Sequence, residues 1–366
     1  MTDPTYTLWL QTFLALSALG IGLMLHLKWH PLRESFSDAW DMLQSLGWLV
    51  PLMAALQWLS GTSTPWSLPS LMESGHALTS WHEMRQLWPK AAQEVALVTH
   101  SFFPPWPLAL AVPGLLSLLM WRVKRFPYRY DSRKKRPAVQ WSLMAAVLLS
   151  WCWLGMEGYA LFKPMPEWLE TIRELCRSLA QACMMAGVQV YMILLVMGWL
   201  NPEEPDAHKD LWLALELTLA RWRGVMLLTG MEMMWLLAWH SISDQSSYLT
   251  MGVLVEASLL FAAMPMVVAW QRMPLASMLE LTPRIFIRSL LALLGWFISA
   301  TVLLTLVHLS LRDMQDLGGE NAFWAGLIRI LIALVLATTR SWLFLTFVIT
   351  LLRHGFKTNA PQERGN

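Results

Sequence analysis

Residues 289–309 read SLLALLGWFISATVLLTLVHL, a run without a single Asp, Glu, Lys or Arg. A helix that crosses a bilayer needs about 20 mostly apolar residues, so this run predicts a transmembrane helix. Similar runs recur along the 366-residue chain, in which 56% of the residues are hydrophobic and 14% are charged. Soluble domains carry about 25% charged residues. The composition excludes a soluble enzyme, a disordered chain and a secreted disulfide scaffold, and it predicts an all-α polytopic integral membrane protein.

The apolar runs predict about nine transmembrane helices (seven to nine) within a single transmembrane domain, residues 1–366. The nine candidate spans are 6–27, 46–60, 106–121, 139–162, 178–200, 224–242, 249–270, 289–309 and 325–352. The second and third are short for a bilayer; a re-entrant course for both would leave seven spans. No basic stretch precedes the first run and no small-residue cleavage site follows it, so we interpret 6–27 as a retained span rather than a signal peptide.

The distribution of Lys and Arg predicts how the chain is oriented, because cytoplasmic loops of membrane proteins carry an excess of basic residues. Of the 27 basic residues, 19 lie in the connections after spans one, three, five and seven and in the C-terminal tail, and six lie in the other four connections. We therefore predict an outside N-terminus, a cytoplasmic tail at 353–366 and a location in a bacterial inner membrane. The formal net charge of +2 does not indicate a nucleic-acid partner.

The connection at 122–138 carries the densest positive charge, which predicts a basic cytoplasmic loop. Basic residues near a membrane surface attract anionic headgroups by about 1 kcal/mol each. The candidates for headgroup binding are Arg122, Lys124, Arg125, Arg129, Arg133, Lys134, Lys135 and Arg136. The alternative is that this cluster only anchors the topology.

Three predicted cytoplasmic segments share one layout, which forms a weak internal repeat. Residues 31–43, 207–223 and 274–288 each place polar side chains on one helical face and large apolar ones on the other, and each runs into a span. Such helices lie in the interface plane, so we expect three flat helices that meet their spans at a sharp angle. They would form a docking surface for a partner, as coupling helices do in transporters. The alternative is that loops near a membrane are often amphipathic.

The predicted outer face contains one long loop and one amphipathic helix. The loop at 61–105 holds short helices near 70–88 and 90–100, and it carries His76, His82 and His100. The first two are six positions apart and do not share a helical face, so this spacing does not predict a metal site. A second outer amphipathic helix is expected at 164–177.

Ionisable residues inside spans are the usual indication of a functional site in a membrane protein. The deepest candidates are Glu232, Glu256 and Arg340. An isolated Arg at that depth costs at least about 2.5–3.5 kcal/mol, and a carboxylate partner lowers this cost. We therefore predict that Arg340 contacts Glu232 or Glu256, with Glu256 slightly favoured. The pair is either structural or part of an ion path. Glu157 and His308 fall at span ends, where we expect solvated side chains.

No motif in the sequence predicts catalysis, and we expect no cofactor and no metal. The three cysteines lack metal or disulfide spacing and are interpreted as core residues between helices. The leading hypothesis is a non-catalytic subunit of a larger membrane assembly whose partners are membrane lipids and other protein subunits. The alternative is a transporter or permease subunit coupled to a separate cytoplasmic ATPase or an ion gradient. A lipid-modifying enzyme ranks last, because no cluster of His, Asp or Glu marks an interfacial active site.

Overall fold

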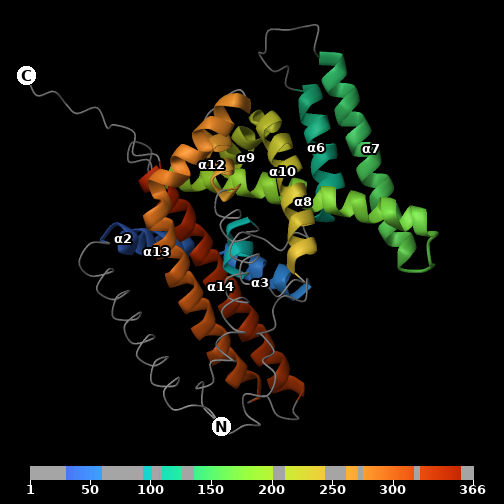
Figure 1. Cartoon of the computed structure of the whole chain (residues 1–366). Coiled ribbons are helices and arrows are strands. Elements are labelled where there is room, and N and C mark those ends of the chain that lie inside the picture. The colour runs from blue at the N-terminus through green and yellow to red at the C-terminus, as the bar shows by residue number, and fades with distance from the viewer. Residues whose placement is uncertain are drawn as a thin grey trace, which may run out of the picture.

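Only helices occur in the regular structure of the residues that the computed structural model describes (Figure 1). Those residues are 30–59, 94–100, 107, 109–125, 136–200, 211–243, 261–270, 275–316 and 322–355. The named helices are α2 (His30–Ser45), α3 (Leu49–Leu59), α6 (Val112–Arg125), α7 (Arg136–Ala160), α8 (Glu167–Trp199), α9 (Leu211–Ala220), α10 (Trp222–Ser243), α12 (Met264–Trp270), α13 (Leu275–Asp316) and α14 (Ala322–Gly355).

Four helices in this part of the chain are long and apolar enough to cross a membrane. Their apolar stretches are Leu143–Ala160 in α7, Glu167–Trp199 in α8, Glu280–His308 in α13 and Phe323–Gly355 in α14. The bent pair α2–α3 makes a fifth if it counts as one broken span. The predicted spans at 106–121 and 224–242 correspond to shorter apolar helices, and the span at 6–27 lies outside the described residues. A helical membrane protein is therefore consistent with the structure, whereas nine spans stay a prediction.

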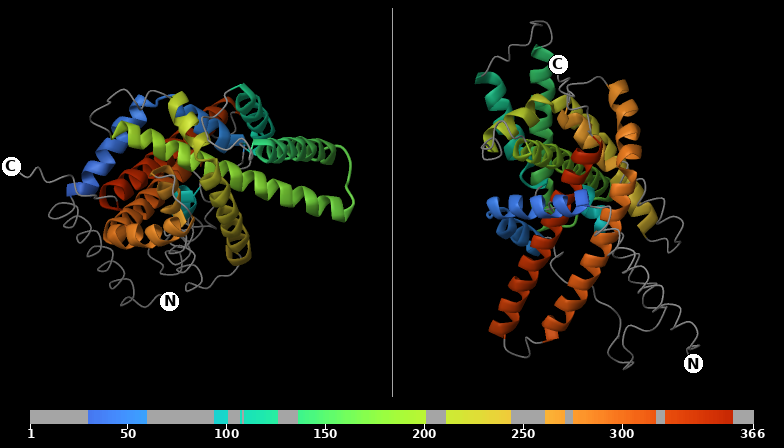
Figure 2. Two further views of the ribbon diagram at one scale, coloured as in Figure 1. Left: turned by 90° about the horizontal axis from the view of Figure 1, so that it is seen from above. Right: turned by 90° about the vertical axis from the view of Figure 1, so that its left-hand side faces the viewer.

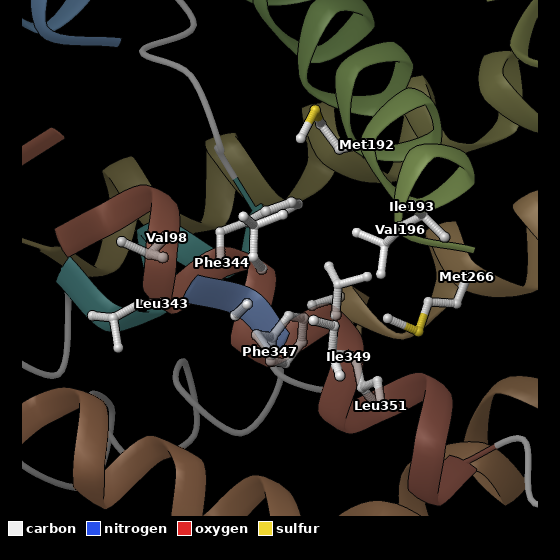
Figure 3. Close-up of a cluster of buried hydrophobic side chains, with 14 of the residues drawn as sticks. Val98, Met192, Ile193, Val196, Met266, Leu343, Phe344, Phe347, Ile349 and Leu351 are labelled. Carbon is white, nitrogen blue, oxygen red and sulfur yellow. The ribbon is translucent and has the colours of Figure 1, made fainter. Parts of the chain in front are cut away.

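The core forms around the C-terminal half of α14, which packs against α13, α2, α3 and α8. Phe344 and Phe347 are buried there with side chains from α8 and α12, such as Met192 and Met266 (Figure 3). Buried Val98, from the short helical segment 94–100, belongs to the same cluster. This segment thus brings its flanking polar residues into an apolar interior.

The α2–α3 unit contains the sharp turn that the sequence predicts. The two helices meet at 88° across a turn at 46–48. The buried face of α2 packs against α14, where Trp342 donates a 2.9 Å hydrogen bond from Nε1 to the carbonyl oxygen of Phe36. Arg353 adds ion pairs to Glu34 and Asp38 of α2. The chain itself therefore covers this face of α2, and the position of α2 at a membrane surface stays a prediction.

The other two segments of the expected repeat differ from the first. At 207–223, α9 ends at Ala220, and α10 begins at Trp222 after one turn residue. At 274–288 the expected separate helix is wrong, because the segment continues into its span as the single helix α13 (Leu275–Asp316). Pro283 lies within this helix, and Figure 1 shows α13 bent near its N-terminal end, as a proline inside a helix produces.

The helix expected at 164–177 also merges with the span that follows it, because α8 runs unbroken from Glu167 to Trp199. Its N-terminal half packs with α6 and α7, and these three form an arm that projects from the rest of the molecule (Figures 1 and 2). A small separate core holds the arm together, centred on Trp153 of α7 and Ala180 of α8. The arm leaves α7 sparsely covered: 17% of its apolar stretch is buried, against 72% for α14.

Candidate functional site

The buried charges of the described residues converge on the helical segment 94–100, which lies among α8, α10, α13 and α14. Four small or branched apolar residues at 95–98 separate Glu94 from the polar pair Thr99 and His100. Val95, Ala96 and Val98 are buried and anchor the segment in the core. Glu94 and His100 are buried with them, so this segment carries one ionisable residue at each end into the interior.

Glu94 lies between two cationic or polar side chains from different helices. The Nη2 atom of Arg340, in α14, lies 2.7 Å from Oε1 of Glu94, and Arg340 Nε donates to the same oxygen at 2.8 Å. Nε2 of His308, in α13, lies 2.9 Å from Oε2. A carboxylate only accepts hydrogen bonds, so the imidazole nitrogen that faces it carries the proton in this arrangement. Both carboxylate oxygens are thus used, and Glu94 joins α13 to α14.

His100 makes the second contact, with α10. Its Nδ1 lies 3.1 Å from Oε2 of Glu232, and its ring stacks on Trp235 with centroids 4.2 Å apart and planes inclined by 12°. Gln189 of α8 donates a hydrogen bond from Nε2 to the carbonyl oxygen of His100. Its own Oε1 is buried without a hydrogen-bond partner among the described atoms. The segment is therefore held by polar contacts to α8 and α10 as well as to α13 and α14.

This network corrects the predicted partner of Arg340. Among the described residues, the buried carboxylate that contacts Arg340 is Glu94 of the predicted outer loop and not the predicted Glu232. Glu232 is indeed buried and contacts His100. Glu256 lies outside the described residues. The sequence signal for this segment is the apolar run at 95–98, which lies between Glu94 and the polar pair Thr99 and His100.

Two residues expected to be solvated at span ends are instead enclosed. His308 is buried against Glu94. Glu157 of α7 accepts hydrogen bonds from Arg177 of α8, at 3.1 Å from Nε and 2.7 Å from Nη2, and another from Trp153 Nε1 at 3.1 Å. The two-pronged contact between Arg177 and Glu157 fixes where α8 crosses α7, because both guanidinium donors must meet one carboxylate.

The basic cluster lies at one end of the α6–α7 hairpin. Arg122, Lys124 and Arg125 occupy the last turn of α6, and Arg136 is the first residue of α7. The other four members of the cluster, Arg129 and residues 133–135, lie outside the described residues. Headgroup binding by this cluster stays a prediction.

The cysteines are free thiols, but they do not all match the expected core positions. Cys152 is exposed on α7, while Cys176 and Cys183 of α8 are partly covered. In the described part of the chain, no group of three or more His, Cys, Asp or Glu side chains is arranged to hold a metal ion. The buried ionisable residues that the structure brings together, Glu94 with Arg340 and His308, and His100 with Glu232, link parts of the chain that are distant in sequence.

The ionisable side chains of this network satisfy one another's hydrogen-bonding groups. Burial of one charge without a partner is strongly unfavourable, whereas a hydrogen-bonded pair of opposite charges is tolerated inside a helical bundle. Arg340 supplies a cation and two hydrogen bonds to Glu94 across the core, and His100 contacts the carboxylate of Glu232. No family model matches the chain, and neither a curated protein nor a solved structure is detectably similar to it.

Proposed function

We propose that this chain is a non-catalytic integral membrane subunit of a larger assembly in a bacterial inner membrane. The observation that carries the proposal is the sparse internal packing of α7. Its apolar stretch Leu143–Ala160 is the least buried of the four candidate spans. A span that buries so little surface against its own chain has a broad face free for helices of a partner subunit.

The composition of that face supports a protein partner. Ala145, Cys152 and Gly155 are exposed along α7, and a Cβ added at Gly155 would meet no atom within 4 Å. Small residues at the surface of a membrane helix let the backbone of a second helix approach closely. Larger side chains such as Leu148 and Leu149 flank them and would fill the space between the helices.

The proposed orientation places the C-terminus in the cytoplasm and the N-terminus outside. In Figure 1 the basic end of the α6–α7 hairpin, the N-terminal end of α13 and the C-terminal end of α14 lie toward one side of the molecule. The close approach of Gly355 to Ile285 agrees with this arrangement, because both belong to segments expected to be cytoplasmic. Convergence of these ends on one side supports the orientation derived from the basic residues.

A second candidate function is a transporter or permease subunit, coupled to a separate ATPase or to an ion gradient. The buried contacts of Glu94 with His308 and of Glu232 with His100 favour it, because ionisable residues inside membrane bundles often mark ion paths. The same contacts connect helices distant in sequence, which suits a structural role equally well.

The test is purification of the tagged full-length chain in mild detergent, with identification of the proteins that co-purify. The subunit proposal predicts a stoichiometric set of membrane proteins, and photo-crosslinks from an amino acid placed at position 152 should reach one of them. A stoichiometric ATPase would support the transporter instead. Purification of the chain alone, with crosslinks only to lipid, would contradict the subunit proposal.

A further inference from the structure

We propose that the N-terminal part of α8, residues 167–179, is an anchor that lies in the lipid headgroup region, with one apolar stripe immersed in the membrane. The stripe consists of Trp168, Ile172, Leu175 and Leu179, all of which are exposed large hydrophobic side chains. We refer to these four residues as the α8 stripe. The proposal depends on the membrane location of the chain but not on the existence of partner subunits.

The length of α8 exceeds what a direct crossing of the hydrocarbon layer needs, so its N-terminal part can lie in the headgroup region. Its 33 residues extend about 50 Å at 1.5 Å per residue. The hydrocarbon core of a bilayer is about 30 Å thick, so about 13 residues exceed what a direct crossing needs. The charged residues of α8 lie in its first third, between Glu167 and Arg177, so this end is the part that remains outside.

The spacing of the α8 stripe produces one continuous apolar face. Positions 168, 172, 175 and 179 follow the pattern of i, i+4, i+7 and i+11, which places the four side chains on one side of a helix. One flank of the same segment packs against the arm, since Cys176 and Ala180 belong to the small core that the arm shares with α6 and α7. The stripe therefore faces away from the protein.

The charged residues on the side of the helix opposite the stripe are paired with one another. Arg173 pairs with Glu170 and Glu174, and Arg177 pairs with Glu174 and with Glu157 of α7. These contacts form one ladder along the face opposite the stripe. Because the ladder includes Glu157, it also fixes the crossing of α7 and α8, and this crossing directs the stripe outward.

Aromatic and apolar residues at the α7–α8 corner argue that lipid, rather than water or a second copy, covers the stripe. Leu161 and Phe162 in the turn are 82% and 85% exposed, and Tyr159 and Trp168 lie on either side of it with about half or more of their surfaces exposed. Tyr and Trp gather at the level of the headgroups in membrane proteins, where one part of the ring is apolar and the other is polar. The corner thus has the composition of an interfacial anchor.

The charge balance of residues 167–177 indicates that the segment does not need anionic lipids in order to insert. Between positions 167 and 177 there are three carboxylates, Glu167, Glu170 and Glu174, and two guanidiniums, Arg173 and Arg177. A segment with this balance gains nothing from anionic headgroups, in contrast to basic amphipathic helices. Insertion should therefore occur in vesicles made only of zwitterionic phosphatidylcholine.

The test is site-directed spin labelling of the full chain in phosphatidylcholine vesicles. The labels are placed at Ile172→Cys on the stripe and at Glu170→Cys, an exposed position on the opposite side of the helix, in a background with Cys152, Cys176 and Cys183 changed to Ala. We expect the label at 172 to collide readily with oxygen but not with a water-soluble nickel complex, at a depth of about 5–10 Å. The label at 170 should be accessible to the nickel complex.

Two results would overturn the proposal. Equal access of the nickel complex to both labels would place the stripe in water. A label at 172 that neither reagent reaches, with spin–spin broadening between molecules, would show that a second copy covers it. Because the cysteine replacements carry a risk to folding, the wild-type chain is also labelled with a photoreactive phosphatidylcholine, and peptides from 161–179 should carry the adduct. Absence of adducts there, with adducts on α13 and α14, contradicts the proposal.

Discussion

Arg340 and Glu94 are separated by 246 positions in the sequence, and their side chains meet at 2.7 Å inside the helical core. The contact connects α14, one of the four helices long and apolar enough to cross a membrane, to a short segment between α3 and α6. Because His308 contacts the other oxygen of the same carboxylate, three separate parts of the chain depend on one buried group. The account of the fold therefore depends on the placement of segment 94–100, and that placement is open to direct tests.

The ion pair between Arg177 and Glu157 should stabilise the projecting arm. Arg177→Gln removes two charge-assisted hydrogen bonds to Glu157 and should lower the free energy of unfolding by about 1–3 kcal/mol. The control is Arg284→Gln, whose ion pair with Glu280 is exposed on both sides and should contribute less than about 1 kcal/mol. Thermal unfolding in detergent measures both variants. Equal losses of stability in the two variants would contradict a stabilising role of the Arg177–Glu157 ion pair.

Gly224 marks a place where α10 approaches α12 too closely for a side chain. A Cβ at this position would lie 2.6 Å from Cγ1 of Val268, whose branched side chain is buried and has little freedom to move. Gly224→Ala should therefore destabilise the fold by about 1–3 kcal/mol through overpacking. Gly230→Ala in the same helix meets no atom within 4 Å and should leave stability unchanged or raise it.

The second variant that tests this approach is the combination of Gly224→Ala with Val268→Ala, which removes the obstructing methyl groups. It should recover part of the thermal stability lost in Gly224→Ala. A double variant no more stable than Gly224→Ala alone would show that α10 and α12 do not pack as described.

Trp342 should hold α2 against α14. Trp342→Phe keeps an aromatic ring beside Phe36 and Trp40 but removes the hydrogen bond to the Phe36 carbonyl oxygen, at a cost of about 0.5–1.5 kcal/mol. Hydrogen exchange of the amides at 30–45 should accelerate, while exchange in α8 stays unchanged. Trp324→Phe, at an exposed position of the same helix, is the matched control. Unchanged exchange at 30–45 would contradict the role of Trp342.

Several features of the fold could be predicted from the sequence because they depend on local apolar content. The long runs at 289–309 and 325–352 are helices in the structure, and the elbow after 31–43 is present where Gly47 interrupts the helical pattern. The full length of α8 is not predicted, because the expected boundary between 164–177 and 178–200 follows the edge of the apolar run. No proline lies at that boundary, and α8 continues through it as one helix from Glu167 to Trp199.

The site could be predicted only in part. Burial of Arg340 required a carboxylate near it, and this requirement is met by Glu94. The identity of the partner depends on where the short segment 94–100 packs. The sequence predicts a short helix near 90–100, but hydropathy over about 20 residues does not indicate that so short a helix is buried. It places Glu232 deep in a span, and it does not indicate that His100 meets this carboxylate.

The most direct test of the account is a double-mutant cycle on Glu94 and Arg340, measured by thermal unfolding of the full chain in detergent. Arg340→Gln alone should destabilise the protein by about 3–5 kcal/mol, because it leaves the buried carboxylate without its cation. Adding Glu94→Gln should restore part of the lost stability, with a coupling energy of about 0.5–3 kcal/mol between the two positions. Glu232→Gln, paired in the structure with His100, should show no coupling to Arg340. Additive effects of Glu94→Gln and Arg340→Gln, together with coupling between Arg340 and Glu232, would contradict the account.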